Sequence, residues 1–127
     1  MAGLTKHNFS EVESLSGCRF TVSAETASGA DIFHVVPSNS SILDEVWLYA
    51  HNYSSSDVEV VFMMGLTGVS TDRLATARDG VAITIPFRSG RALVFDGYLI
   101  SHSLSAAVYA ETGDSITIDG FVNRITS

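Results

Sequence analysis

Cysteine is almost absent from this chain: Cys18 is the only one among 127 residues. A single cysteine excludes an internal disulfide, so none supports the fold. The first residues also lack the apolar run of a signal peptide. We therefore expect a protein that is made and folded in a reducing cytoplasm.

Basic residues are scarce as well. Lysine and arginine together number 7 against 14 acidic residues, which leaves a formal net charge of −7, and Lys6 is the only lysine. The chain therefore lacks a basic cluster that could displace counterions from a nucleic-acid backbone or bind an anionic membrane surface. No stretch reaches membrane-spanning length. We expect neither nucleic acid nor a membrane as a partner.

Proline occurs twice, and no segment has a convincing helical pattern. Short runs of alternating apolar and polar residues recur instead, interrupted about every 8–12 residues by small and polar turn residues, which is typical of antiparallel strands. The runs with this pattern are 19–24, 31–36, 43–53, 58–64, 81–85, 92–95, 105–110 and 116–125. Residues 98–104 are ambiguous between strand and loop.

These runs predict one domain over residues 18–127 with about eight strands, folded as an all-β antiparallel sandwich of the jelly-roll kind. Asp96-Gly97 and Gly113-Asp114 are predicted as tight turns between strands. Asp119-Gly120 is predicted as a bulge within the last strand. A chain of this length can bury roughly two-thirds of its unfolded surface in one core.

The run from residue 43 to residue 53 contains the only tryptophan. Read with period two, one face is apolar, while the other carries aromatic side chains with polar tips. The apolar face comprises Val46, Leu48 and Ala50, and the aromatic face comprises Glu45, Trp47, Tyr49 and His51. We predict a subunit interface made by Trp47, Tyr49, His51 and Tyr53. Core packing is the alternative for Trp47 and Tyr49.

The first 17 residues are polar and lack a strand pattern, so we predict an N-terminal arm over residues 1–17. Its apolar side chains are too sparse to form a core of their own. We expect them to dock on a neighbouring subunit: Leu4, Phe9, Val12 and Leu15.

Residue types that carry out catalysis are present, but not in a catalytic pattern. The histidines lie in separate segments without metal-ligand spacing: His7, His34, His51 and His102. Asp44 and Glu45 point to opposite faces of a strand, so they cannot flank one substrate bond, and we expect both as solvated charges. For His34 and His51 we expect packed rings with one hydrogen-bonded nitrogen. We predict no enzyme activity, no cofactor and no metal; a zinc site joining His34, His51 and His102 is the alternative.

Five stretches form a recognisable set: Leu43-Asp-Glu-Val-Trp-Leu-Tyr-Ala-His-Asn, Asp57-Val-Glu-Val, Ile83-Thr-Ile-Pro86, residues 90–95, and residues 116–125 with Gly120-Phe-Val-Asn-Arg-Ile. Together they resemble small virion structural proteins of tailed bacteriophages, of the type found in marine phages. The resemblance covers about the last two-thirds of the chain. Before about Pro37 nothing resembles that family.

The resemblance implies a non-enzymatic decoration (cement) protein that binds the outer head surface and ties major capsid subunits together. Its expected location is the virion, and its expected partners are its own copies, as a homotrimer, and the major capsid protein or another virion protein. The alternative is a neck, tail or fibre component with a carbohydrate- or receptor-binding sandwich. Its aromatic platform would then consist of Trp47, Tyr49 and Tyr53.

Overall fold

The computed structural model describes residues 3–11, 20–26, 29–67 and 80–127, and these residues form nine β-strands. The strands are β1 (Gly3–His7), β2 (Phe20–Val22), β3 (Asp31–Val35), β4 (Ile42–Asn52), β5 (Val58–Thr67), β6 (Val81–Ile85), β7 (Arg91–Ser101), β8 (Leu104–Ala110) and β9 (Ile116–Thr126). Among the described residues, no helix is long and apolar enough to cross a membrane.

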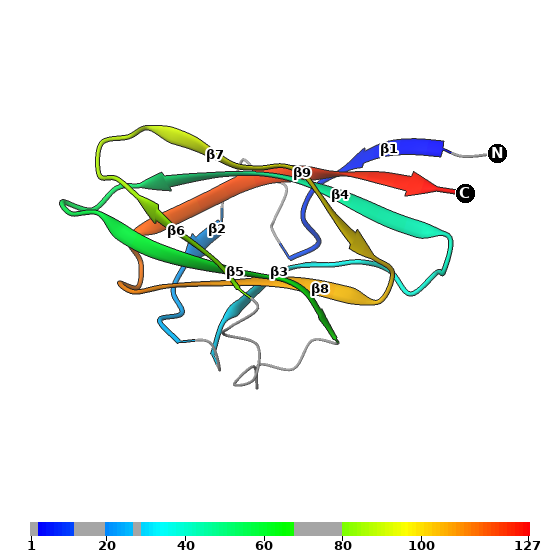
Figure 1. Ribbon diagram of the computed structural model, residues 1–127, viewed down its shortest axis with the longest axis horizontal. Coiled ribbons are helices and arrows are strands. Elements are labelled where there is room, and N and C mark those ends of the chain that lie inside the picture. Colours follow the sequence, from blue (N-terminus) through cyan, green and yellow to red (C-terminus); the bar gives the residue numbers. More distant parts are fainter. Residues whose placement is uncertain (1–2, 12–19, 27–28, 68–79) are drawn as a thin grey trace.

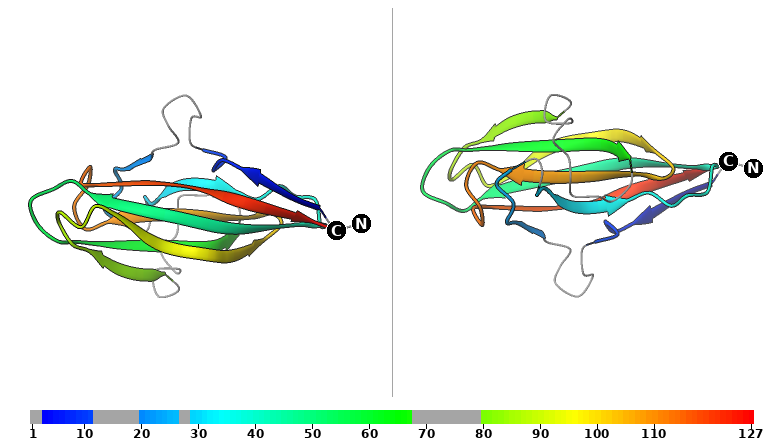
Figure 2. Two further views of the ribbon diagram at one scale, coloured as in Figure 1. Left: turned by 90° about the horizontal axis from the view of Figure 1, so that it is seen from above. Right: turned by 90° about the horizontal axis from the view of Figure 1, so that it is seen from below.

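The strands form two antiparallel sheets that pack face to face (Figures 1 and 2). The larger sheet has the order β1-β9-β4-β7, with β2 also paired to β9, and the smaller has the order β3-β8-β5-β6. β2 pairs with β9, β3 with β8, β4 with β7, and β5 with β6, as in one long hairpin. Pairing of β9 with β4 and of β8 with β5 rolls this hairpin up. The result is a jelly roll, and the predicted all-β sandwich is confirmed.

The core lies between the sheets, and the alternation along β4 shows how the sequence builds it. Val46, Leu48 and Ala50 are fully buried, whereas the residues between them are half-buried on the other side of the sheet. Period-two patterning places every second side chain on the core face of a strand. Phe62 is in edge-to-face contact with Phe33 and with Phe95, at centroid distances of 6.5 and 5.3 Å.

Residues 60–63 of β5 and 105–108 of β8 are buried on both faces of the smaller sheet, which explains the apolar runs of these strands. Their core-side residues belong to the main cluster, while Val61, Met63 and Ala107 join a second cluster on the far side of the smaller sheet. Leu66 and Ala30 complete this second cluster. A strand covered on both faces has no polar side to alternate with.

The N-terminal segment is part of the sandwich over residues 3–11, so the prediction of a separate arm is wrong there. β1 pairs with β9 from Gly3 to His7, although all five of its residues are exposed. Phe9 is 1% exposed and packs edge-to-face on Phe33, with the ring centroids 5.0 Å apart. It therefore fills the protein's own core and cannot dock on a neighbour. Val12 and Leu15 lie outside the described residues.

Two glycine predictions are also wrong. Asp96-Gly97 is a bulge within β7 and not a turn, because Trp47 pairs with Asp96 while Val46 pairs with Tyr98. β7 thus continues into the ambiguous segment 98–104 and ends at Ser101, and β8 begins at Leu104 after a turn. Asp119-Gly120 is a regular part of β9, since its pairing with β4 runs without a register shift. Gly120 has φ of +153°, and a Cβ there would collide with the Trp47 carbonyl oxygen, so close strand approach requires this glycine.

Candidate binding face on the larger sheet

The first arrangement of residues that could carry out chemistry is a buried polar network on the core side of β4. His34 and Asp44 are both 0% exposed, and His34 Nε2 lies 2.7 Å from Asp44 Oδ2. Arg124 of β9 donates to both carboxylate oxygens, from Nε at 2.9 Å and Nη2 at 3.0 Å. The Ser10 N–H donates to His34 Nδ1 at 3.0 Å. Because Nδ1 accepts a hydrogen bond, the proton of the neutral ring is on Nε2 and is donated to Asp44.

These contacts set the charge state of Asp44. Burial alone raises its pKa, but hydrogen bonds from His34 and Arg124, together with the positive charge of Arg124, outweigh burial. The pKa of Asp44 is lowered from 3.8 to about 2. The expectation of a solvated carboxylate is therefore wrong for Asp44. For His34 the expectation of a packed ring is confirmed, with both nitrogens hydrogen-bonded rather than one.

The network contains serine, histidine and aspartate, but these residues are not arranged as a catalytic triad. The Ser10 hydroxyl accepts the Val35 N–H at 2.8 Å, and it is the Ser10 backbone that reaches the histidine. A nucleophilic serine needs a hydrogen bond from its hydroxyl to the histidine. It also needs open space in which the hydroxyl can attack the carbonyl carbon of a substrate. Here the histidine is sealed in the core, so the network fastens residues 9–10 to β3 and β4.

The side of the larger sheet that faces away from the core, termed the outer face, carries the second arrangement. Cross-strand pairing aligns its side chains in rows over β1, β9, β4 and β7. One part, termed the apolar half, consists of Leu4, Leu43, Trp47, Leu99, Phe121 and Ile125. Leu4 and Leu99 are 66% and 53% exposed. An exposed apolar group rimmed by polar side chains is a common mark of an interaction surface.

The aromatic centre of the apolar half is held by ring stacking and hydrogen bonds. The rings of Trp47 and Phe121 are stacked with an interplanar angle of 5° and centroids 6.1 Å apart. Trp47 Nε1 and Asn123 Nδ2 both donate to Glu45 Oε1, at 2.7 and 3.2 Å. The hydrogen bond from Trp47, followed by that from Asn123, lowers the pKa of Glu45. The Lys6 ammonium lies 4.3 Å from the centroid of the Phe121 ring.

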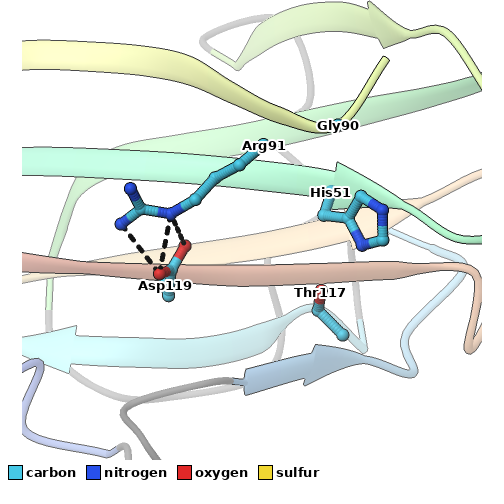
Figure 3. A pocket seen from close by; sticks show the side chains of 5 residues that line it. All are labelled: His51, Gly90, Arg91, Thr117 and Asp119. Carbon is cyan, nitrogen blue, oxygen red and sulfur yellow. Dashed lines mark hydrogen bonds and ion pairs between the residues drawn. The ribbon is translucent and has the colours of Figure 1, made fainter. Parts of the chain in front are cut away.

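The other part of the outer face, termed the polar half, comprises Tyr49, His51, Arg91, Thr117 and Asp119, with the exposed Leu93 paired beside Tyr49. Arg91 reaches from β7 across β4 to Asp119 on β9 (Figure 3), with Nη2 2.8 Å and Nε 3.0 Å from Asp119 Oδ2. Its guanidinium lies 3.7 Å from the centroid of the Tyr49 ring. The hydrogen bonds to Asp119 raise the pKa of Arg91.

A pocket of about 190 Å³ opens beside this ion pair. It is lined by His51, Gly90, Arg91, Thr117 and Asp119 (Figure 3). The His51 ring also lies beside that of Tyr53, with centroids 6.5 Å apart. Among the described residues this is a pocket of mixed donors and acceptors, without a concentration of one charge.

The structure brings together most of the predicted interface residues. Trp47, Tyr49 and His51 are half-buried on the outer face, whereas Tyr53 follows β4 in a loop and is 50% exposed. Leu4 lies on the same face as this aromatic row. In the described part of the chain, no three histidine, cysteine, aspartate or glutamate side chains are placed to hold a metal ion.

Sequence reasoning missed the partners that other strands contribute to this face. Arg91, Asp119 and Phe121 lie beside β4 only because of the register of β7 and β9. The one available signal was the alternation in residues 116–125, which places Asp119 and Phe121 on the same side of β9.

No family model matches the chain, and no curated protein matches it. Among solved structures, a chain from a study described as "Bacillus endospore appendages form a novel family of disulfide-linked pili" is similar, with 13% sequence identity. The similarity covers 100% of this chain and 87% of that chain, with a TM-score of 0.47. Likeness at this level carries no argument about function.

Proposed function

We propose that the protein is a non-enzymatic structural protein of a tailed-phage virion. In this proposal it is a decoration protein that binds the outer head surface as a homotrimer and ties neighbouring major capsid subunits together. The apolar half of the outer face is the surface through which the copies meet in this proposal. It contains Trp47 of the predicted interface residues, whereas Tyr49, His51 and Tyr53 lie outside it. The observation that carries the proposal is this exposed apolar group around the Trp47–Phe121 stack.

The energetic argument starts from Leu4 and Leu99. More than half of each side chain is exposed, and burying one such side chain fully is worth roughly 1.5–3 kcal/mol. The rings of Trp47 and Phe121 are already held by neighbouring side chains, so little conformational entropy is lost when a partner covers them. A contact of this kind is modest alone and gains strength when cyclic symmetry repeats it.

The fold and the resemblance support the proposal in different ways. Jelly rolls occur in viral capsid and lectin domains alike, so the fold is compatible with an attachment role without selecting it. The stretches that resemble phage virion proteins include β4 and β9. These two strands supply Trp47 and Phe121.

The copy number of the protein in purified virions tests the proposal. A decoration protein is expected in numbers proportional to the major capsid protein, measured by quantitative mass spectrometry of both. A copy number of only a few to a few dozen per virion would contradict decoration. It would favour the neck, tail or fibre alternative. Absence from purified virions would contradict both.

A further inference from the structure

The pocket in the polar half is not used by the proposed assembly, which is placed in the apolar half. We propose that this pocket binds one neutral pyranose unit of a carbohydrate. The inference goes beyond the proposed function, because it adds a ligand to a protein proposed only to assemble. The residues involved are His51, Arg91, Thr117 and Asp119, from β4, β7 and β9 (Figure 3).

The hydrogen-bonding groups match a polyol. Arg91 and Asp119 neutralise each other through contacts of 2.8 to 3.2 Å, so the pocket has no uncompensated charge that calls for an anion or a cation. The guanidinium has further N–H donors, and each carboxylate oxygen has further acceptor capacity. The Thr117 hydroxyl and the His51 ring each both donate and accept. Adjacent sugar hydroxyls also donate and accept, so they match this mixture of donors and acceptors. An ionised phosphate or carboxylate mainly accepts hydrogen bonds and matches it less well.

The pocket is organised before any ligand arrives. Arg91 is held between Asp119 and the Tyr49 ring, which fixes a long side chain that would otherwise lose rotamer freedom on binding. The loop after β4 is fixed as well, because the buried Asn52 side chain donates to the Ser56 and Ile85 carbonyl oxygens at 2.8 and 2.7 Å.

The size and rim of the pocket fit one ring. Its volume of about 190 Å³ is below the roughly 300–1,000 Å³ typical of sites for drug-sized ligands. The His51 ring, which lines the pocket and lies beside the Tyr53 ring, provides apolar surface for the C–H side of a sugar. Gly90 leaves its side of the mouth open, since a Cβ there would meet no atom within 4 Å.

Amide chemical shifts of the ¹⁵N-labelled full chain test this proposal directly. The probes are the methyl glycosides of glucose, galactose, mannose and N-acetylglucosamine, with glucuronate and inorganic phosphate as anionic probes. We expect at least one neutral glycoside to shift the amides of His51, Arg91 and Thr117, with a Kd of about millimolar because so small a ligand makes few contacts. Glucuronate and phosphate are expected to bind more weakly.

Two substitutions probe the geometry. Thr117→Val removes one hydroxyl at almost constant volume and is expected to weaken binding about five- to tenfold. Arg91→Lys keeps the charge but loses the planar fork, so it is expected to weaken binding by more than Thr117→Val. Thr84→Val, at an exposed position of β6 in the other sheet, is the matched control and should bind as the original chain does.

The proposal is overturned by any of three results. These are no shift with any neutral glycoside well above millimolar concentration, tighter binding of an anionic probe, or unchanged binding by Thr117→Val and Arg91→Lys. Its failure is separable from failure of the assembly proposal. A substitution at Leu99 is expected to change oligomeric mass and leave sugar binding intact, while Thr117→Val is expected to do the reverse.

Discussion

The larger sheet contains two bidentate arginine–aspartate pairs, one on each of its faces. On the core side, Arg124 of β9 donates to Asp44 of β4 at 2.9 and 3.0 Å. On the outer face, Arg91 of β7 donates to Asp119 of β9 at similar distances. The chemistry is the same, but the surroundings differ: the Asp44 side chain is 0% exposed, whereas those of Arg91 and Asp119 are 55% and 25% exposed.

This difference in burial assigns the two pairs different roles. A charge removed from water depends on its partners, so loss of one partner leaves the other with a large desolvation penalty. A solvated pair contributes little to stability because water replaces a lost partner. We infer that the Asp44 pair holds the fold together. The Asp119 pair keeps its hydrogen-bonding groups accessible, which is the property that a ligand site requires.

The first prediction compares the two aspartates directly. Asp44→Ala removes the hydrogen-bonding partner of both His34 and Arg124. It is expected to lower the free energy of unfolding by about 3–5 kcal/mol. Asp119→Ala is expected to cost less than about 1 kcal/mol. Urea denaturation of both variants beside the original chain measures the two effects. Equal losses would contradict the separation into a structural and a surface pair.

The second prediction applies the same inside–outside comparison to the N-terminal segment. Phe9→Ala empties a fully buried site and is expected to cost about 3–5 kcal/mol. Leu4→Ala, five residues earlier on an exposed strand, is expected to change the stability of the monomer by less than about 0.5 kcal/mol, measured at a protein concentration below that of assembly. Thermal and urea unfolding check both values. A mild effect of Phe9→Ala would restore the idea of a free arm.

The third prediction concerns acid. The pKa of Asp44 is lowered to about 2 in the folded protein, so the carboxylate stabilises the fold above the pKa of the unfolded chain. This stabilisation is lost as the pH falls from about 5 toward 2, and it amounts to about 2–3 kcal/mol. Asp44→Asn should be less stable at neutral pH but should lose less stability over that pH range. Parallel acid dependence in both proteins would contradict the assignment to Asp44.

The parts of the fold that sequence predicted are those controlled by local alternation. The run 43–53 matches β4, residues 81–85 match β6, and residues 105–110 match β8 within one residue. Period two reports directly which face of a strand is buried, so these strands and their core residues can be found without knowing their partners.

The failures involve pairing between distant segments. Gly97 and Gly120 carry the same local signal, yet one lies in a bulge and the other in a regular strand, because the register with β4 decides between them. Phe9 gave no strand pattern, since its burial depends on Phe33 of another strand. The pairs Asp44–Arg124 and Arg91–Asp119 likewise form only after β4, β7 and β9 are aligned. Local sequence cannot specify such contacts.

The oligomeric mass in solution is the most direct test of the apolar half as the surface where copies meet. Light scattering of the original chain is expected to give three times the 13.6 kDa chain mass. Leu99→Lys, in the apolar half, is expected to give the monomer mass. Phe87→Lys, at a comparably exposed apolar residue outside the outer face, is expected to leave the trimer intact. A monomeric original chain at tens of micromolar, or an unchanged trimer in Leu99→Lys, would contradict the account.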